Sequence, residues 1–324
     1  SHWIKDYHVD GLRFDLMELM DIKTTKEIVR KTSRIDKNFL IYGEPWKGGD
    51  SPVKNGTYKG SQKKENFSVF NDTFRDAIRG DNSPSRGFIN GDQHNAIKAW
   101  NIVEGLKGSI YTITYNPDES INYMDAHDNY TLWDQIEKTQ NYNTQYGQYR
   151  DNIGDNILDN YNVRQYLLGA SILFTAQGIP FFQGGSEFLR TKQGDHNSYK
   201  SGDIINSIKW SDKVKYNEVF EYYKGLIKIR KQYDLFKITS PEDVKKNLSI
   251  KFAHNDDKSG VIISSISSED NSEEFIIIYN GTSIDNYDVN SEISLDVDKE
   301  WSIIANGKLA GVEVIKKIVD SRSE

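Results

Sequence analysis

The chain has 324 residues, 12% of them aromatic, and a net charge of −7 with no cysteine. The negative charge and the absence of a basic run argue against nucleic acid as a partner. The lack of cysteine excludes disulfides and thiolate metal sites, and no apolar run approaches the roughly 18 residues that a membrane-spanning helix needs. The many aromatic side chains suit core packing and also sugar binding, because the C–H face of a glucose ring can lie on an aromatic ring.

The first predicted element is a strand at Val9–Phe14. Alternation along this strand places Arg13 and Asp15 on one face and the apolar Leu12 and Phe14 on the other. Burying a charge costs several kcal/mol unless it is paired. Taken alone, this pair is therefore read most simply as a structural salt bridge.

Strands and helices alternate from here to about residue 240. A helix is predicted from a capping box at Thr24–Glu27 to Ile35, and a buried strand follows at Phe39–Gly43. A strand, a helix and a strand within about 35 residues form a βαβ unit, which implies a parallel sheet. Further strands are predicted at Phe67–Phe70, Asn122–Ala126 and Ile179–Gln183, and further helices at Asn160–Gln177 and Tyr216–Tyr233. Five parallel strands fit either part of a (β/α)8 barrel or an open sheet.

The character of the sequence changes after about Asp234. Short β-rich segments take over, separated by Asn, Asp and Ser and by the turn signals Asn280-Gly281 and Asn306-Gly307. The predicted strands are Leu248–Phe252, Val261–Ile266, Phe275–Tyr279, Ile293–Val297, Trp301–Ala305 and Val312–Ile318. The sequence therefore predicts two domains, an α/β domain at residues 1–240 and an antiparallel β-sandwich at residues 241–324.

Polar side chains follow the predicted parallel strands. Asp15 ends the first strand, Glu44 follows the second, and His127 and Asp128 follow the fourth. Each alone has a plain structural explanation, such as a helix cap or a solvated loop. Together they place three carboxylates at the same end of one sheet, where like charges repel unless they have a use. Two carboxyl groups that flank one bond are the groups needed for glycoside hydrolysis.

Three of these stretches resemble the alpha-amylase superfamily of glycoside hydrolases. They are GLRFD at Gly11–Asp15, GEPW at Gly43–Trp46 and HDN at His127–Asn129, which are similar to the signature regions on barrel strands four, five and seven of that family. Further segments are similar to one branch, the type I pullulanases: Phe70–Gly80 (FNDTFRDAIRG), Ile179–Trp210, and the C-terminal NGK at Asn306–Lys308 with AGVEVI at Ala310–Ile315.

The resemblance implies a (β/α)8 TIM barrel of which this chain holds strands four to eight, followed by the β domain. The family's first signature region and its Tyr-Asn-Trp-Gly-type motif are absent from this sequence. We therefore expect the N-terminal half of the same enzyme, with barrel strands one to three, to be a partner of this chain. Without that half, the chain is expected to be inactive.

The resemblance also implies roles for individual residues. Asp15 is the expected nucleophile, Glu44 the acid and base, and Asp128 a third carboxylate that holds sugar hydroxyls. The expected substrate-binding residues are Arg13, Trp46, His127, Arg190, Asn197 and Tyr199. No cofactor is expected to be required; the likeness leaves structural calcium open, but the sequence shows no metal site.

The implied activity is retaining hydrolysis of α-1,6 links in pullulan and branched α-glucans such as starch and glycogen. Two alternatives stay open: an enzyme that cleaves α-1,4 links or both kinds, and a fragment that binds glycan without cleaving it. Maltotriose as the product of pullulan indicates α-1,6 cleavage, and panose indicates α-1,4 cleavage.

Overall fold

The computed structural model describes residues 1–140 and 148–318. Its centre is a five-stranded sheet in the order β1-β2-β3-β4-β5, with every neighbouring pair parallel. The strands are β1 (Gly11–Phe14), β2 (Leu40–Gly43), β3 (Ser68–Phe70), β4 (Ser120–Tyr123) and β5 (Ile179–Phe181). All five predicted strands are confirmed, and their parallel order matches the prediction from the βαβ pattern. The fourth begins and ends earlier than predicted, so that His127 and Asp128 lie on a loop beyond its end.

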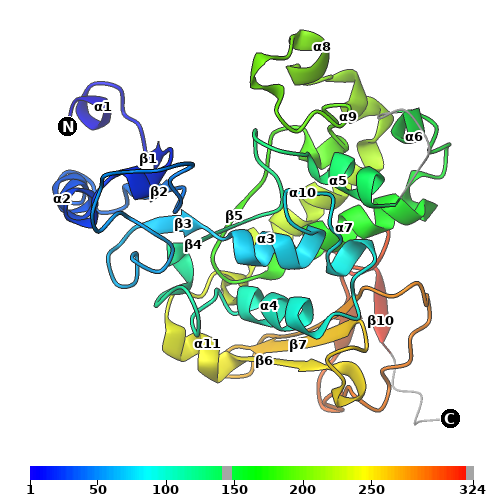
Figure 1. Cartoon of the computed structure of the whole chain (residues 1–324). Coiled ribbons are helices and arrows are strands. Elements are labelled where there is room, and N and C mark those ends of the chain that lie inside the picture. The colour runs from blue at the N-terminus through cyan, green and yellow to red at the C-terminus, as the bar shows by residue number, and fades with distance from the viewer. Residues whose placement is uncertain (141–147, 319–324) are drawn as a thin grey trace, which may run out of the picture.

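The described helices are α1 (His2–Lys5), α2 (Ile22–Thr32), α3 (Asp72–Arg79), α4 (Ala96–Leu106), α5 (Leu132–Thr139), α6 (Gln148–Asp151), α7 (Tyr161–Thr175), α8 (Asp203–Asn206), α9 (Ser211–Lys215), α10 (Asn217–Gln232) and α11 (Pro241–Asn247). Figure 1 shows α2 beside β1 and β2, and α3, α4, α5, α7 and α10 gathered on the other side of the sheet. Within the described ranges, no helix is long and apolar enough to cross a membrane.

The start of α2 corrects the predicted capping box. The N-cap is Asp21, whose carboxylate accepts a hydrogen bond from the Thr24 amide at 3.0 Å and another from the Thr24 hydroxyl at 2.7 Å. An Asp in extended conformation satisfies an amide of the first turn well. The helix therefore begins two residues before Thr24, and it ends at Thr32 rather than Ile35.

The two faces of the sheet are packed differently. On the outer face, Ile41 and Val69 form a core with Met17 and with Val29 of α2. On the inner face, Phe70 lies at the centre of an aromatic group, with its ring centroid 5.0 Å from that of Tyr123, 5.2 Å from Phe181 and 5.8 Å from Tyr42. The inner face thus offers a rigid apolar floor to whatever lies above it.

The C-terminal part folds into two small antiparallel sheets. One contains β6 (Leu248–Phe252), β7 (Val261–Ser267) and β8 (Glu274–Asn280), and the other contains β9 (Trp301–Ile303) and β10 (Lys316–Ile318). Phe252, Ile262 and Tyr279 share one core with residues of α7 and α10. The two parts of the chain are thus joined by a common core, and the division at residue 240 stays a prediction.

The predicted strand at Ile293–Val297 is wrong, because this segment has no strand in the structure. Asp296 explains the difference. Its carboxylate accepts from the Asp298 amide at 3.0 Å, and its carbonyl accepts from the Lys299 amide and the Trp301 indole. Such local hydrogen bonds compete with the ladder bonds of a sheet.

Candidate active site

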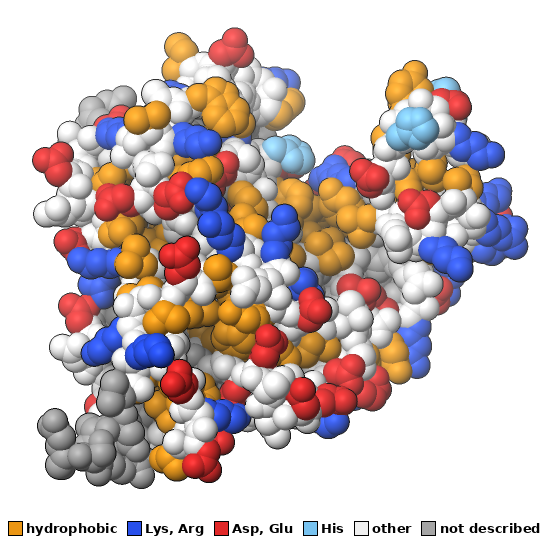
Figure 2. All heavy atoms as spheres, turned by 180° about the vertical axis from the view of Figure 1, so that it is seen from behind, with side chains coloured by type: hydrophobic (Ala, Val, Ile, Leu, Met, Phe, Trp, Pro, Cys, Tyr) orange, Lys and Arg blue, Asp and Glu red, His pale blue; other side chains and the backbone are white. Residues whose placement is uncertain are grey.

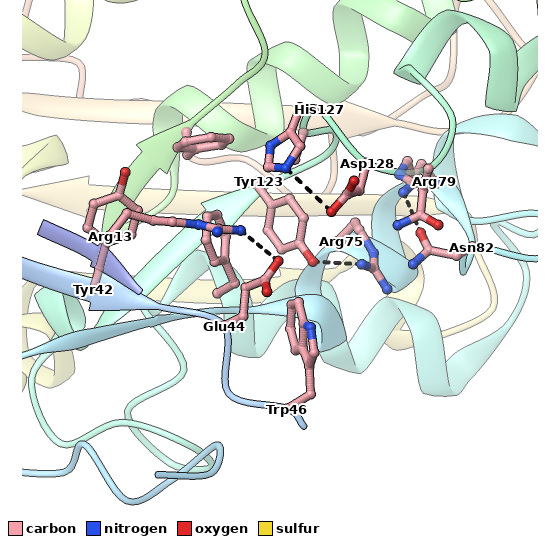
Figure 3. Close-up of a pocket in the computed structure, with 14 residues that line it drawn as sticks. Arg13, Tyr42, Glu44, Trp46, Arg75, Arg79, Asn82, Tyr123, His127 and Asp128 are labelled. Atoms are coloured by element: carbon pink, nitrogen blue, oxygen red, sulfur yellow. Dashed lines mark hydrogen bonds and ion pairs between the residues drawn. The ribbon is translucent and has the colours of Figure 1, made fainter. Parts of the chain in front are cut away.

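A cavity of about 330 Å³ opens on the inner face of the parallel sheet (Figure 3). The space-filling view shows the molecule hollowed between its N-terminal part and the rest, with apolar side chains on the floor of the hollow (Figure 2). The lining residues are Arg13, Tyr42, Glu44, Trp46, Phe70, Arg75, Arg79, Asn82, Tyr123, Ala126, His127, Asp128, Asn129 and Phe181. Five of the nine residues predicted for the site from sequence therefore line one cavity. They are Arg13, Glu44, Trp46, His127 and Asp128.

Arg13 links the first two predicted catalytic carboxylates. One of its guanidinium nitrogens, Nη1, lies 2.8 Å from Asp15 Oδ1, and the other, Nη2, lies 2.7 Å from Glu44 Oε1. Glu44 also accepts a hydrogen bond from the Leu16 amide at 3.1 Å. The pair of charges that looked structural in the sequence is thus shared with a carboxylate from the next strand.

The two carboxyl groups differ in exposure. The Asp15 side chain is 67% exposed and is not among the residues that line the cavity, whereas the Glu44 side chain, which lines it, is 10% exposed. The hydrogen bond from Arg13 lowers the pKa of Asp15, and burial raises the pKa of Glu44. A hydrogen bond between the two carboxyls reinforces both shifts. The environment therefore favours an ionised Asp15 beside a protonated Glu44, which is the division of protonation that acid and nucleophile chemistry needs.

His127 and Asp128 lie on the loop after β4. Their side chains are 67% and 59% exposed, and His127 Nε2 lies 3.4 Å from Asp128 Oδ2. Both face the cavity from the side opposite Glu44 (Figure 3). Trp46 lies on the same rim as Glu44, where its half-buried ring can contact a sugar.

The remaining three predicted binding residues do not line the cavity. The guanidinium of Arg190 donates to the carbonyls of Gly184 at 2.9 Å and Asn206 at 2.6 Å, so it braces its own loop. The backbone amide of Asn197 donates to the Asp195 carboxylate. The Tyr199 side chain is exposed, with the Lys200 ammonium over its ring. Their assignment to the substrate groove stays a prediction.

Several lining residues were missed from the sequence. Tyr42, Phe70, Tyr123 and Phe181 are the aromatic group on the inner face of the sheet. Arg75, Arg79 and Asn82 line another part of the cavity (Figure 3). One signal could have found Tyr42: it lies two residues before Glu44, so alternation puts both side chains on the same face. The arginines gave no such signal, because they reach the cavity from α3 and not from a strand end.

Among the described residues, no group of three or more His, Asp or Glu could hold a metal ion. The expectation that no cofactor is required stays a prediction.

Comparison with known proteins places the chain in a family, although no family model matches it. The pullulanase of Bacillus subtilis strain 168 is 32% identical over 254 residues, which are 76% of this chain and 33% of that protein. The solved pullulanase of Bacillus acidopullulyticus superposes with a TM-score of 0.84 at 31% identity, over 98% of this chain and 37% of that one. This chain belongs to the pullulanase family.

Other pullulanase structures agree. The pullulanase of Paenibacillus barengoltzii, solved in complex with maltohexaose and alpha-cyclodextrin, has a TM-score of 0.76 at 29% identity, over 87% of this chain and 42% of that one. The chain spans about a third of the length of the Bacillus pullulanases that it matches. The parallel sheet and the small antiparallel sheets are accordingly part of a larger fold in these relatives.

Proposed function

We propose that this chain carries the nucleophile and the acid/base of a debranching glycoside hydrolase that cleaves α-1,6-glucosidic links in pullulan and branched α-glucans. The observation that carries the proposal is the pair of Asp15 and Glu44, bridged by Arg13 and biased toward opposite protonation states. Membership of the pullulanase family supports the choice of substrate, as do the maltooligosaccharide complexes of the relatives.

The chemistry follows from this pair. The Asp15 carboxylate attacks the anomeric carbon, and the bond from that carbon to the leaving oxygen breaks as Glu44 gives the oxygen its proton. Water then attacks the anomeric carbon of the glycosyl-enzyme, its proton passes to Glu44, and Asp15 is released. Two carboxyl groups that bind the same guanidinium suit this retaining route, because an inverting enzyme holds them about 6.5–9.5 Å apart to admit a water molecule.

The other residues of the cavity complete the site. Asp128 and His127 hydrogen-bond hydroxyls of the sugar that is attacked, and Trp46 stacks on a sugar of the leaving chain. Arg13 keeps Asp15 ionised in an otherwise acidic mouth. The aromatic floor of Tyr42, Phe70, Tyr123 and Phe181 excludes water from beneath the reacting bond.

We further propose that β1–β5 are strands four to eight of a (β/α)8 barrel in residues 1–240, followed by a C-terminal β-sandwich domain in residues 241–324. β1 and β5 are the edges of the described sheet, and edge strands expose unpaired backbone groups that another strand can cover. The partner that covers both edges is the N-terminal half of the same enzyme, with barrel strands one to three.

The test joins this chain to the upstream part of the Bacillus subtilis pullulanase, either as a fusion or by co-production, and assays pullulan. We expect maltotriose as the product of the joined protein and no hydrolysis by the 324-residue chain alone. Panose would show α-1,4 cleavage instead. A joined protein that folds and binds maltotriose without hydrolysing pullulan would support the rival, a glycan-binding fragment.

Replacing Arg13 by Gln is expected to move the pH dependence of kcat/KM in the joined protein. Activity on the acid side requires ionised Asp15, and activity on the alkaline side requires protonated Glu44. Arg13 lowers the pKa of Asp15 and also lowers that of Glu44, so its removal raises both. Both limbs of the profile therefore shift to higher pH, and the peak activity falls. A pH profile that keeps both limbs in place would contradict the role of Arg13.

A further inference from the structure

Lys192 is buried, with 1% of its surface exposed, on the loop that follows β5. Lysine is almost never fully buried unless it is paired. Yet Lys192 forms no ion pair with any described residue, and its ammonium donates to the backbone carbonyl of His127 at 3.0 Å. A buried ammonium without an ion-pair partner costs free energy that a neutral side chain would avoid. Its place directly behind the His127–Asp128 loop indicates a use in the site.

The loop that carries Lys192 is firmly anchored. Asp134 of α5 is fully buried, and its carboxylate accepts from the Lys192 amide at 2.8 Å and from the Thr191 hydroxyl. Burial lowers the pKa of Lys192, Arg190 lowers it too, and the carboxylates of Asp134, Asp128 and Asp195 raise it. The Lys192 ammonium therefore interacts electrostatically with the Asp128 carboxylate, while Asp134 of α5 holds the Lys192 backbone.

A second buried cation holds the same segment. Arg79 of α3 is fully buried, and its Nε donates to the carbonyl of Met124. The segment from Met124 to Asp128 is thus held at two carbonyls by two buried cations, Arg79 from α3 and Lys192 from the β5 loop. Asp128 is exposed, and His127 is its only ion-pair partner among the described residues. These two backbone bonds therefore set where its carboxylate stands.

We propose that Lys192 is a positioning residue of the site: it orients the His127–Asp128 peptide and supplies positive charge behind the Asp128 carboxylate. This inference rests on the proposed function, because it assumes that Asp128 holds the substrate. Lys192 does not line the cavity, so it acts on the reaction through Asp128. A displacement of about 1 Å at such a group costs up to about 10²-fold in rate.

The kinetic test is a double-mutant cycle in the joined protein that hydrolyses pullulan. Lys192→Met removes the charge and the donor at similar volume, and Lys192→Arg keeps both. Lys209→Met changes an exposed lysine between α8 and α9 as a matched control. We expect Lys192→Met to lower kcat/KM by about 10–100-fold, Lys192→Arg to recover most of that loss, and Lys209→Met to have no effect. In the Asp128→Asn background, Lys192→Met is expected to cost less than about twofold, since residues that act as one unit are not additive.

Equal losses from Lys192→Met in both backgrounds would overturn the proposal, as would no loss in either. Where Lys192→Met fails to fold, Lys192→Gln replaces it in the same cycle, because it removes the charge and keeps a donor. A neutral donor that fully restores kcat/KM would also contradict the part assigned to the charge.

A readout that does not depend on hydrolysis separates this inference from the proposed function. In the 324-residue chain, which has six histidines, the imidazole NMR resonance of His127 is assigned with His127→Gln. Lys192→Met is expected to shift and broaden this resonance, and Lys209→Met to leave it in place. An unchanged His127 resonance in Lys192→Met would overturn the inference even if the joined protein is active, and a shifted one would support it even if the joined protein is not.

Discussion

Asp15→Asn and Glu44→Gln are each expected to lower hydrolysis of pullulan by the joined protein by at least about 10³-fold. Asp15→Asn removes the atom that bonds to the anomeric carbon, and Glu44→Gln removes the proton that the leaving oxygen needs. Steady-state kinetics on pullulan measure both losses. Wild-type turnover by either variant would show that its assignment is wrong.

A substrate with a good leaving group distinguishes the two roles. An aryl glycoside with an acidic phenol departs without a proton from the enzyme, so Glu44→Gln is expected to retain formation of the glycosyl-enzyme and a burst of phenol. Asp15→Asn is expected to give no burst, because no covalent intermediate can form. Bursts in both variants, or in neither, would contradict the division of roles between the two carboxyls.

The largest expected loss of stability follows Arg230→Met. Arg230 of α10 is buried and donates to the carbonyls of Phe174 at 3.0 Å, Ala176 at 2.7 Å and Gly178 at 2.5 Å, where α7 ends. Burial lowers its pKa to about 10, so it remains charged at neutral pH. Without it, three carbonyls lose charged hydrogen bonds, and the free energy of unfolding is expected to fall by about 3–5 kcal/mol. Denaturant unfolding of the chain measures this change.

A matched variant controls for the loss of an arginine as such. Arg164 of α7 pairs with Asp285 at the surface, with 45% of its side chain exposed, and Arg164→Met is expected to change stability by less than about 1 kcal/mol. Equal effects of the two substitutions would contradict the assignment of a stabilising role to Arg230.

The sequence allowed the parallel sheet to be predicted because its signals are local. Buried apolar strands alternate with helices, and each strand is short and clearly bounded, as at Leu40–Gly43. The N-cap of α2 was predicted three residues late because Thr24 and Asp21 are both good caps, and only the backbone conformation of Asp21 decides between them. The strand predicted at Ile293–Val297 failed because Asp296 binds its own backbone, an effect that an apolar pattern does not show.

The site shows the same contrast. Glu44 and Asp128 could be predicted to share a cavity because carboxylates stand at the ends of parallel strands, where such folds gather their chemistry. Arg79 and Lys192 could not be predicted, because each comes from an element distant in sequence and donates to a backbone carbonyl near the cavity. The sequence likewise does not show that Asp15 is exposed and Glu44 buried, or that Arg13 binds both carboxylates.

The most direct measurement is to trap the covalent intermediate. The joined protein is treated with a fluorinated α-glucosyl substrate whose glycosyl-enzyme hydrolyses slowly, and the labelled peptide is sequenced by mass spectrometry. We expect a single glucosyl adduct on Asp15 that is absent from Asp15→Asn. An adduct on another carboxylate, or turnover of the reagent with inversion at the anomeric carbon, would contradict the proposed mechanism.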